Sequence, residues 1–198
     1  MDKKICVFCG SGCGNKKIYA DITEKFAGEI VKNNLTLVYG GGNIGLMGKL
    51  SDAVLKKGGS VIGVIPEFLY NLNLGNKKAN ELKIVKNMHE RKKTMYELSD
   101  YFVALPGGIG TLEELLEIFT WQQLSLHSKP CAVANIEGYF DGLLDFLDKS
   151  VNNGFMKHEH LDNLIIEDNY DKIIPKLRSC KIKNVSKKAV KTASLMQF

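Results

Sequence analysis

Residues 101–117, YFVALPGGIGTLEELLE, constrain the fold more than any other stretch of this chain. Tyr101–Leu105 is a short apolar run rich in residues that favour strands. Pro106–Gly110 is a glycine turn, and from Thr111 apolar residues recur at spacings of three and four, which predicts a helix. A strand followed by a glycine turn and a helix directs backbone N–H groups and the positive end of the helix dipole at the same place. Such a place is suited to binding a phosphate.

The alternation of strand and helix runs from end to end of the chain. Strand-length apolar runs lie at 4–8, 35–39, 60–65, 82–85, 101–105, 130–134 and 164–166, and helical patterns at 19–31, 47–55, 88–98, from 111, at 139–151 and at 170–178. Most of these strands are continuously apolar, which is typical of a parallel sheet covered on both faces. We therefore predict an α/β fold, a doubly wound parallel sheet in one domain over 1–180, with 67–80 as a polar connection.

The net charge of +5 is concentrated at the carboxyl terminus. Residues 181–198 hold five lysines and no acid, and without them basic and acidic residues are equal in number. The body is therefore neutral, which argues against a broad nucleic-acid-binding face. We expect the tail to be solvated and flexible; a nucleic-acid role for it would require salt-sensitive binding that disappears when the tail is deleted.

Cysteine usage and hydropathy indicate a cytoplasmic protein. No apolar run approaches the ~18 residues of a membrane helix, and the apolar patch near the amino terminus is too short for a signal peptide. The chain has five cysteines, an odd number, which fits reduced thiols. Cys6, Cys9 and Cys13 cluster around the first turn without the spacing of a metal site, so buried thiols are the better interpretation.

Three glycine turns follow predicted strands, at 10–14, 40–45 and 107–110. The first misses the dinucleotide pattern G-x-G-x-x-G because Asn15 replaces the third glycine, and no G-K-S/T sequence follows any of them. Each turn alone could serve only to reverse the chain. Because parallel strands end at one edge of a sheet, the three together predict a site where backbone closely approaches a phosphate-bearing ligand.

Charged residues accompany these turns. Glu113, Glu114 and Glu117 open the helix after the third turn, where acids also pair favourably with the helix dipole. An acid beside a bound phosphate is repelled unless it contacts another part of the ligand, such as a ribose hydroxyl or a water molecule. Arg91 and Lys92 begin a helix against its dipole, which favours a ligand role over a solvated face.

Other residues that could carry chemistry have simpler interpretations. His158 and His160 lie in a polar stretch and are expected at the surface. Trp121 is expected in the core or at a dimer contact rather than as a platform for base stacking.

Several motifs together resemble those of the "Lonely Guy" (LOG) family. PGGIGTLEE at 106–114 fits the family pattern P-G-G-x-G-T-x-x-E, YGGGNIGLMG at 39–48 and MHERK at 88–92 fit its companion segments, and VFCGSG at 7–12 resembles its first turn. The resemblance covers about residues 4–178. LOG proteins activate cytokinins by hydrolysing nucleoside 5′-monophosphates and often carry the name lysine decarboxylase.

The resemblance implies a Rossmann-like fold, a homodimer, and hydrolysis of the N-glycosidic bond of an adenosine 5′-monophosphate, with or without an N6 substituent. The match of motifs implies that Arg91 and Glu114 correspond to the catalytic pair of the family. The remaining substrate-binding positions are implied to be Gly10, Ser11, Gly41, Gly42, Met88, Lys92, Gly107, Gly108, Ile109, Gly110, Thr111, Glu117 and Thr120. We expect no metal, no cofactor, and neither nucleic acid nor a membrane as partner.

The sequence departs from the family pattern in two places. Gly12 and Cys13 stand where a second serine is usual, and the 67–80 connection lacks an expected acid, with Asn73 the nearest candidate. These differences bear on base preference more than on the reaction. A lysine decarboxylase usually needs pyridoxal phosphate held as a Schiff base by a lysine. No sequence motif here identifies such a lysine. The alternative function is a non-catalytic carrier of a nucleotide or molybdenum cofactor, against which Arg91 and Glu114 together argue.

Overall fold

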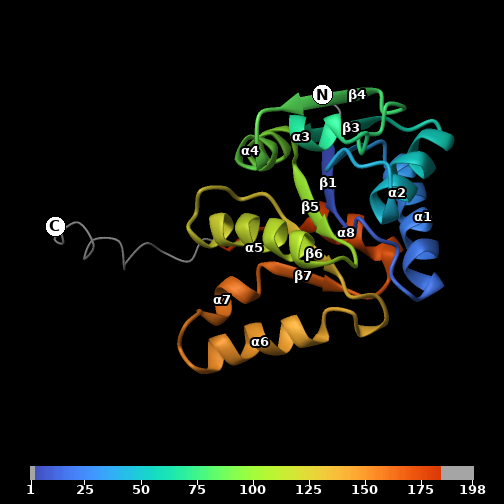
Figure 1. Ribbon diagram of the computed structural model, residues 1–198. Helices are drawn as coiled ribbons and strands as arrows, with labels where there is room; N and C mark the ends of the chain where they lie inside the picture. Colours follow the sequence, from blue (N-terminus) through green and yellow to red (C-terminus); the bar gives the residue numbers. More distant parts are fainter. Residues whose placement is uncertain (1–2, 184–198) are drawn as a thin grey trace, which may run out of the picture.

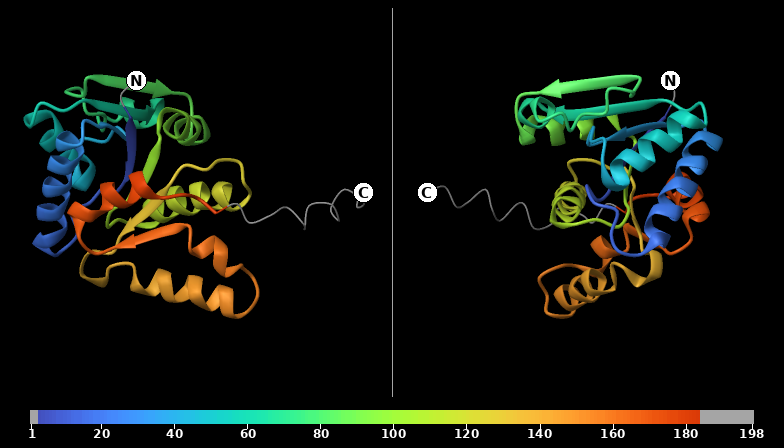
Figure 2. Two further views of the ribbon diagram at one scale, coloured as in Figure 1. Left: turned by 180° about the vertical axis from the view of Figure 1, so that it is seen from behind. Right: turned by 45° about the vertical axis from the view of Figure 1, so that its right-hand side comes forward.

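The computed structural model describes residues 3–183, and these form one parallel sheet with helices on both faces (Figures 1 and 2). The strands are β1 (Lys4–Phe8), β2 (Thr36–Tyr39), β3 (Val61–Pro66), β4 (Glu81–Val85), β5 (Tyr101–Ala104), β6 (Cys131–Ala134) and β7 (Leu164–Glu167). Every pairing between neighbours is parallel. The predicted α/β class and parallel sheet are confirmed.

Helices connect the strands in almost strict alternation. They are α1 (Lys17–Lys32), α2 (Gly45–Lys56), α3 (Glu67–Asn71), α4 (Met88–Leu98), α5 (Ile109–Gln123), α6 (Asp141–Asn152), α7 (His158–Leu161) and α8 (Tyr170–Ser179), with a short 3-10 turn, η1, at Ile136–Gly138. Within residues 3–183 no helix is both long and apolar enough to cross a membrane.

The order of strands places β1 and β5 at the centre of the sheet. The order is β4-β3-β2-β1-β5-β6-β7, so the chain builds outward from β1 in one direction and then returns to add β5 on the other side. The connections therefore diverge between β1 and β5, and the carboxyl ends of these strands border a crevice where ligands bind in such sheets.

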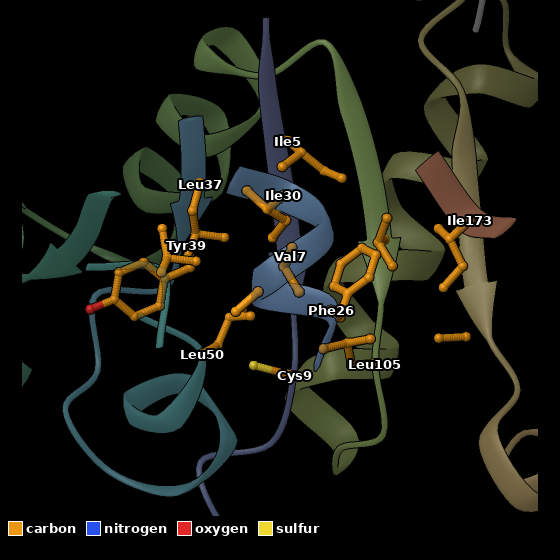
Figure 3. Packing of buried hydrophobic residues seen from close by; sticks show 14 of the residues in the cluster. Ile5, Val7, Cys9, Phe26, Ile30, Leu37, Tyr39, Leu50, Leu105 and Ile173 are labelled. Atoms are coloured by element: carbon orange, nitrogen blue, oxygen red, sulfur yellow. The ribbon is translucent and has the colours of Figure 1, made fainter. Parts of the chain in front are cut away.

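Alternate residues of the central strand β1 enter separate cores on the two faces of the sheet. Ile5 and Val7 of β1 pack with Phe26 and Ile30 of α1 in the cluster of Figure 3, which also includes residues of α2 and α8. Cys6 and Phe8 point the other way and pack with residues of α4, α5 and α6. Both faces are buried, which explains why the strands read as continuous apolar runs.

The sequence placed some boundaries wrongly. The segment 67–80, predicted as a connection only, contains α3, and the stretch with His158 and His160 forms α7, where His158 is exposed and His160 is partly buried. Both helices are too short to show a clear apolar periodicity. Helix α5 begins at Ile109 rather than Thr111, since glycines do not prevent a first turn. The predicted flexible tail, 181–198, lies almost wholly outside the described residues.

Candidate active site

The three glycine turns meet at the carboxyl edge of the sheet, as predicted. The amide of Gly10, after β1, donates to the carbonyl of Pro106, after β5, at 3.1 Å. The carbonyl of Gly10 accepts from the amide of Leu46, in the first turn of α2, at 3.0 Å. Backbone hydrogen bonds therefore fasten the first turn to the other two.

Glycine at position 107 is required by this close approach. A Cβ added there would collide with Thr111 Oγ1 and lie 2.7 Å from the amide nitrogen of Gly10. A larger residue would therefore separate the turn after β5 from the turn after β1. Thr111 itself is buried, so its side chain supports the turn from within the fold.

A cavity of about 240 Å³ opens where the turns meet. It is lined by the predicted residues Gly10, Ser11, Gly107 and Gly108, and also by Tyr19 and Tyr139, which the sequence analysis did not identify. Tyr139 follows β6 and η1 at the same edge of the sheet. The turn sequence Asn135–Gly138 after a predicted strand was the signal that could have pointed to it.

The start of α5 faces this region with backbone donors. Gly108 is the N-cap and provides no side chain to cap the helix. Among the hydrogen bonds of residues 3–183, none uses the amide of Gly108, Ile109 or Gly110 as a donor to the protein. Unsatisfied amides and the positive end of a helix dipole together form a site suited to an anion.

Arg91 and Glu114 form a buried ion pair. The guanidinium Nη1 of Arg91 lies 2.8 Å from Glu114 Oε1, and the two side chains are only 9% and 10% exposed. Nε of Arg91 donates to the carbonyl of Val64 at 3.1 Å, and Nη2 donates to that of Gly40 at 3.4 Å. A Cβ on Gly40 would occupy the place of this guanidinium. The second glycine turn therefore makes room for Arg91, which the protein holds by three of its donors.

Burial sets the electrostatics of Glu114. Loss of hydration raises the pKa of this carboxyl above its ordinary value of 4.5, and the charge of Arg91 partly opposes the shift. The other oxygen of Glu114, Oε2, accepts no hydrogen bond from residues 3–183. It is also not among the polar atoms of these residues that are fully buried without a partner. Glu114 therefore keeps one oxygen available to a ligand.

Lys92 forms a second charged group beside the first. It pairs with Glu113 and lies 3.1 Å from Glu117 Oε1. The hydrogen bond to Glu113 raises the pKa of Lys92, although partial burial opposes the rise. Oε2 of Glu117 is buried without a hydrogen-bond partner among the described residues. This group is charged like the Arg91–Glu114 pair but lies nearer the surface.

The other predicted residues are more dispersed. Gly41 and Gly42 contact the 73–76 segment, where Gly41 O accepts from the amide of Asn76 at 2.8 Å. Met88 and Ile109 are exposed, Ile109 by 84%, and Thr120 is exposed along α5. None of these five residues lines the cavity between the turns. Cys6 and Cys9 are buried thiols as predicted, whereas Cys13 is only partly buried and lines the cavity.

Comparison with known proteins gives two kinds of likeness. The model of a family described as "Possible lysine decarboxylase" matches residues 47–177. Cytokinin riboside 5′-monophosphate phosphoribohydrolase LOG1 of Arabidopsis thaliana is 53% identical over 78% of this chain and 72% of its own. LOG5 of the same plant is also named a cytokinin riboside 5′-monophosphate phosphoribohydrolase. It is 45% identical over 90% of this chain and 78% of its own chain.

Among solved structures, the likeness is one of fold. The molybdenum cofactor binding protein of Rippkaea orientalis superposes with a TM-score of 0.69 at 20% identity, over 90% of this chain and 97% of that one. The molybdenum cofactor carrier protein of Chlamydomonas reinhardtii gives a TM-score of 0.67 at 16% identity, over 90% of this chain and 97% of that one.

Proposed function

We propose, from the premise that the chain belongs to the LOG family of phosphoribohydrolases, that it hydrolyses the N-glycosidic bond of adenosine 5′-monophosphates, with or without an N6 substituent. The products are the free base and ribose 5-phosphate. The observation that carries the proposal is the buried Arg91–Glu114 pair. It stands beside a helix start that offers free amides to a phosphate.

The glycine turns anchor the 5′-phosphate. The amides of Gly108, Ile109 and Gly110 and the dipole of α5 hold the anion, and Ser11 and Gly10 border the same cavity. Fixing the phosphate restricts the ribose, so that its anomeric carbon stays near Glu114 on the second turn of the same helix.

The charged pair acts on the ribose and the departing base. Breaking the bond to the base leaves positive charge on the ribose ring, and the carboxylate of Glu114 stabilises this charge while its free oxygen holds a ribose hydroxyl or a water molecule. Water adds to the anomeric carbon, and a proton passes to the base. Arg91, fixed by Val64 and Gly40, orients the nucleotide, and its charge opposes the rise in the pKa of Glu114 that burial causes.

The description of the family as possible lysine decarboxylases does not fit the lysine of this site. A lysine that forms a Schiff base needs a lowered pKa so that it can act as a nucleophile. Lys92 has a raised pKa because it donates to Glu113 and Glu117. The likeness to molybdenum cofactor proteins concerns the fold alone and does not favour a carrier function.

The test is direct observation of base release. Purified protein is incubated with AMP and, separately, with isopentenyladenosine monophosphate, and the products are separated by chromatography. We expect free adenine or isopentenyladenine to appear together with ribose 5-phosphate. Binding of both nucleotides without release of base would contradict hydrolysis and support a carrier.

Homodimer formation and a cytoplasmic location complete the proposal. Exposed apolar side chains, among them Met88 and Ile109, favour coverage by a second copy of the chain. Light scattering with size-exclusion chromatography measures the mass of the protein in solution, which should be that of two chains.

All five cysteines are free thiols, as expected of a protein in a reducing compartment such as the cytoplasm.

A further inference from the structure

Tyr139 makes a contact that the catalytic pair and the glycine turns do not explain. Its hydroxyl donates a hydrogen bond of 2.6 Å to the carbonyl of Gly107, within the turn after β5. Tyr139 lies 32 residues further along the chain, after β6, and its ring lines the same cavity as Gly107 and Gly108. A separate element of the fold therefore holds the turn.

The loop that carries Tyr139 is itself tightly held. The side-chain oxygen of Asn135 accepts from the amide of Phe140 at 2.7 Å, and its nitrogen donates to Asp141 at 2.7 Å. Glu137 adopts a left-handed conformation, with φ of 54°, which a residue other than glycine adopts only where its surroundings require it. The ring of Tyr19 packs edge-on against that of Tyr139, with centroids 5.3 Å apart. The position of the hydroxyl is therefore fixed before any ligand binds.

The hydrogen bond determines which way the next amide points. In a trans peptide, the carbonyl of Gly107 and the N–H of Gly108 point in opposite directions. A peptide between two glycines rotates with little steric hindrance, so without an anchor this N–H would take several orientations. With the carbonyl held by Tyr139, the N–H of Gly108 points away from the hydroxyl, and it has no acceptor among residues 3–183.

The hydroxyl of Tyr139 does not bind an anion directly in this arrangement. Its one proton is committed to Gly107, so it offers only lone pairs to the cavity, and these repel a phosphate oxygen. Its effect must therefore pass through the Gly107–Gly108 peptide.

We propose that Tyr139 is a positioning residue, which orients the Gly107–Gly108 peptide so that the amide of Gly108 donates to the 5′-phosphate of the substrate. The inference rests on the proposed function, since it assigns a role within that same site. It predicts that Tyr139 contributes to recognition of the phosphate and not to breakage of the bond to the base.

The test is Tyr139→Phe, which removes the hydroxyl and keeps the ring. We expect KM for AMP to rise roughly three- to tenfold, the loss for one hydrogen bond, and kcat to stay within about twofold. The inhibition constant of inorganic phosphate should rise by the same factor as KM. Tyr101→Phe is the matched control, since it removes a hydroxyl at the opposite end of β5 and should change neither constant.

Each outcome decides a separate question. An unchanged KM, or a KM that rises while phosphate inhibits as before, would overturn the role in phosphate recognition. A fall in kcat alone would do the same, because it would place Tyr139 in the chemical step. If the wild-type protein released no base from any monophosphate, the proposed function would fail, and direct calorimetry of phosphate binding to the wild type and Tyr139→Phe would still test the inference.

Discussion

The two halves of the candidate site use different chemical groups, backbone amides in one and charged side chains in the other. The half that we propose receives the phosphate consists of backbone amides at 107–110, supported by contacts between glycine turns. The half that we propose faces the ribose consists of the charged side chains of Arg91 and Glu114, which are buried and lie 2.8 Å apart. Backbone donors can bind an anion without ionising, whereas a buried carboxylate responds to pH and to its neighbour. Changes to the two halves should therefore have separable effects on binding and on rate.

The largest expected effect is on rate, from Glu114→Gln. The amide keeps the shape of the side chain but carries no negative charge to stabilise the ribose in the transition state, so we expect turnover to fall at least ~100-fold. Affinity for the nucleotide should remain, because the phosphate half is intact. Turnover by chromatography and binding by calorimetry measure the two quantities.

The control for this variant is Glu97→Gln, at an exposed carboxylate of α4 paired with Lys93. It should leave turnover unchanged. Unchanged turnover in a folded Glu114→Gln protein would exclude Glu114 from the chemistry.

The backbone half was easier to predict from sequence than the charged half. Glycine turns after apolar strands are local signals, and strand ends of a parallel sheet share an edge, so the meeting of 10–14 and 107–110 followed from the pattern. The pairing of Arg91 with Glu114 joins two helices and could be expected only from the family resemblance. Local spacing also does not show that Gly40 makes room for Arg91 or that Tyr139 reaches Gly107. Such contacts depend on how α4, β6 and the turns pack in three dimensions.

The backbone half should be sensitive to bulk rather than to charge. Gly107→Ala places a methyl group against Thr111 and Gly10, and we expect a loss of stability of about 1–3 kcal/mol, or ~2–4 °C in Tm for each kcal/mol in a domain of this size. Gly12→Ala is the matched control, since a Cβ there meets no atom within 4 Å. Thermal unfolding of both variants measures the difference. Equal Tm values would show that the turns are not tightly joined.

The charged half should be sensitive to pH. Burial raises the pKa of Glu114 above 4.5, so its carboxylate becomes protonated at a higher pH than an ordinary glutamate. A raised pKa in the folded state means that the contribution of Glu114 to stability is complete below 4.5 and is lost as pH rises through the folded pKa. Under the proposed mechanism, activity should change in the opposite direction, because Glu114 acts on the ribose in its ionised form.

Carbon NMR of labelled glutamate side chains, compared with Glu114→Gln to assign the signal, measures this pKa directly. We expect the Glu114 signal to titrate with a midpoint above pH 4.5. We also expect kcat to fall on the acid side of its pH profile with a midpoint above 4.5. A midpoint at or below 4.5 would mean that the charge of Arg91 outweighs burial.

The smallest effect is expected from Lys92→Met, because this residue pairs with partly exposed acids, Glu113 and Glu117. Such pairs contribute about 0–1 kcal/mol to stability, and salt screens them. We expect the free energy of unfolding to fall by no more than about 1 kcal/mol in urea. Lys93→Met, which breaks an exposed pair on the same helix, should change it less. A loss as large as that of Gly107→Ala would show that Lys92 belongs with the buried pair, and that the charged half extends from Arg91 to Glu117.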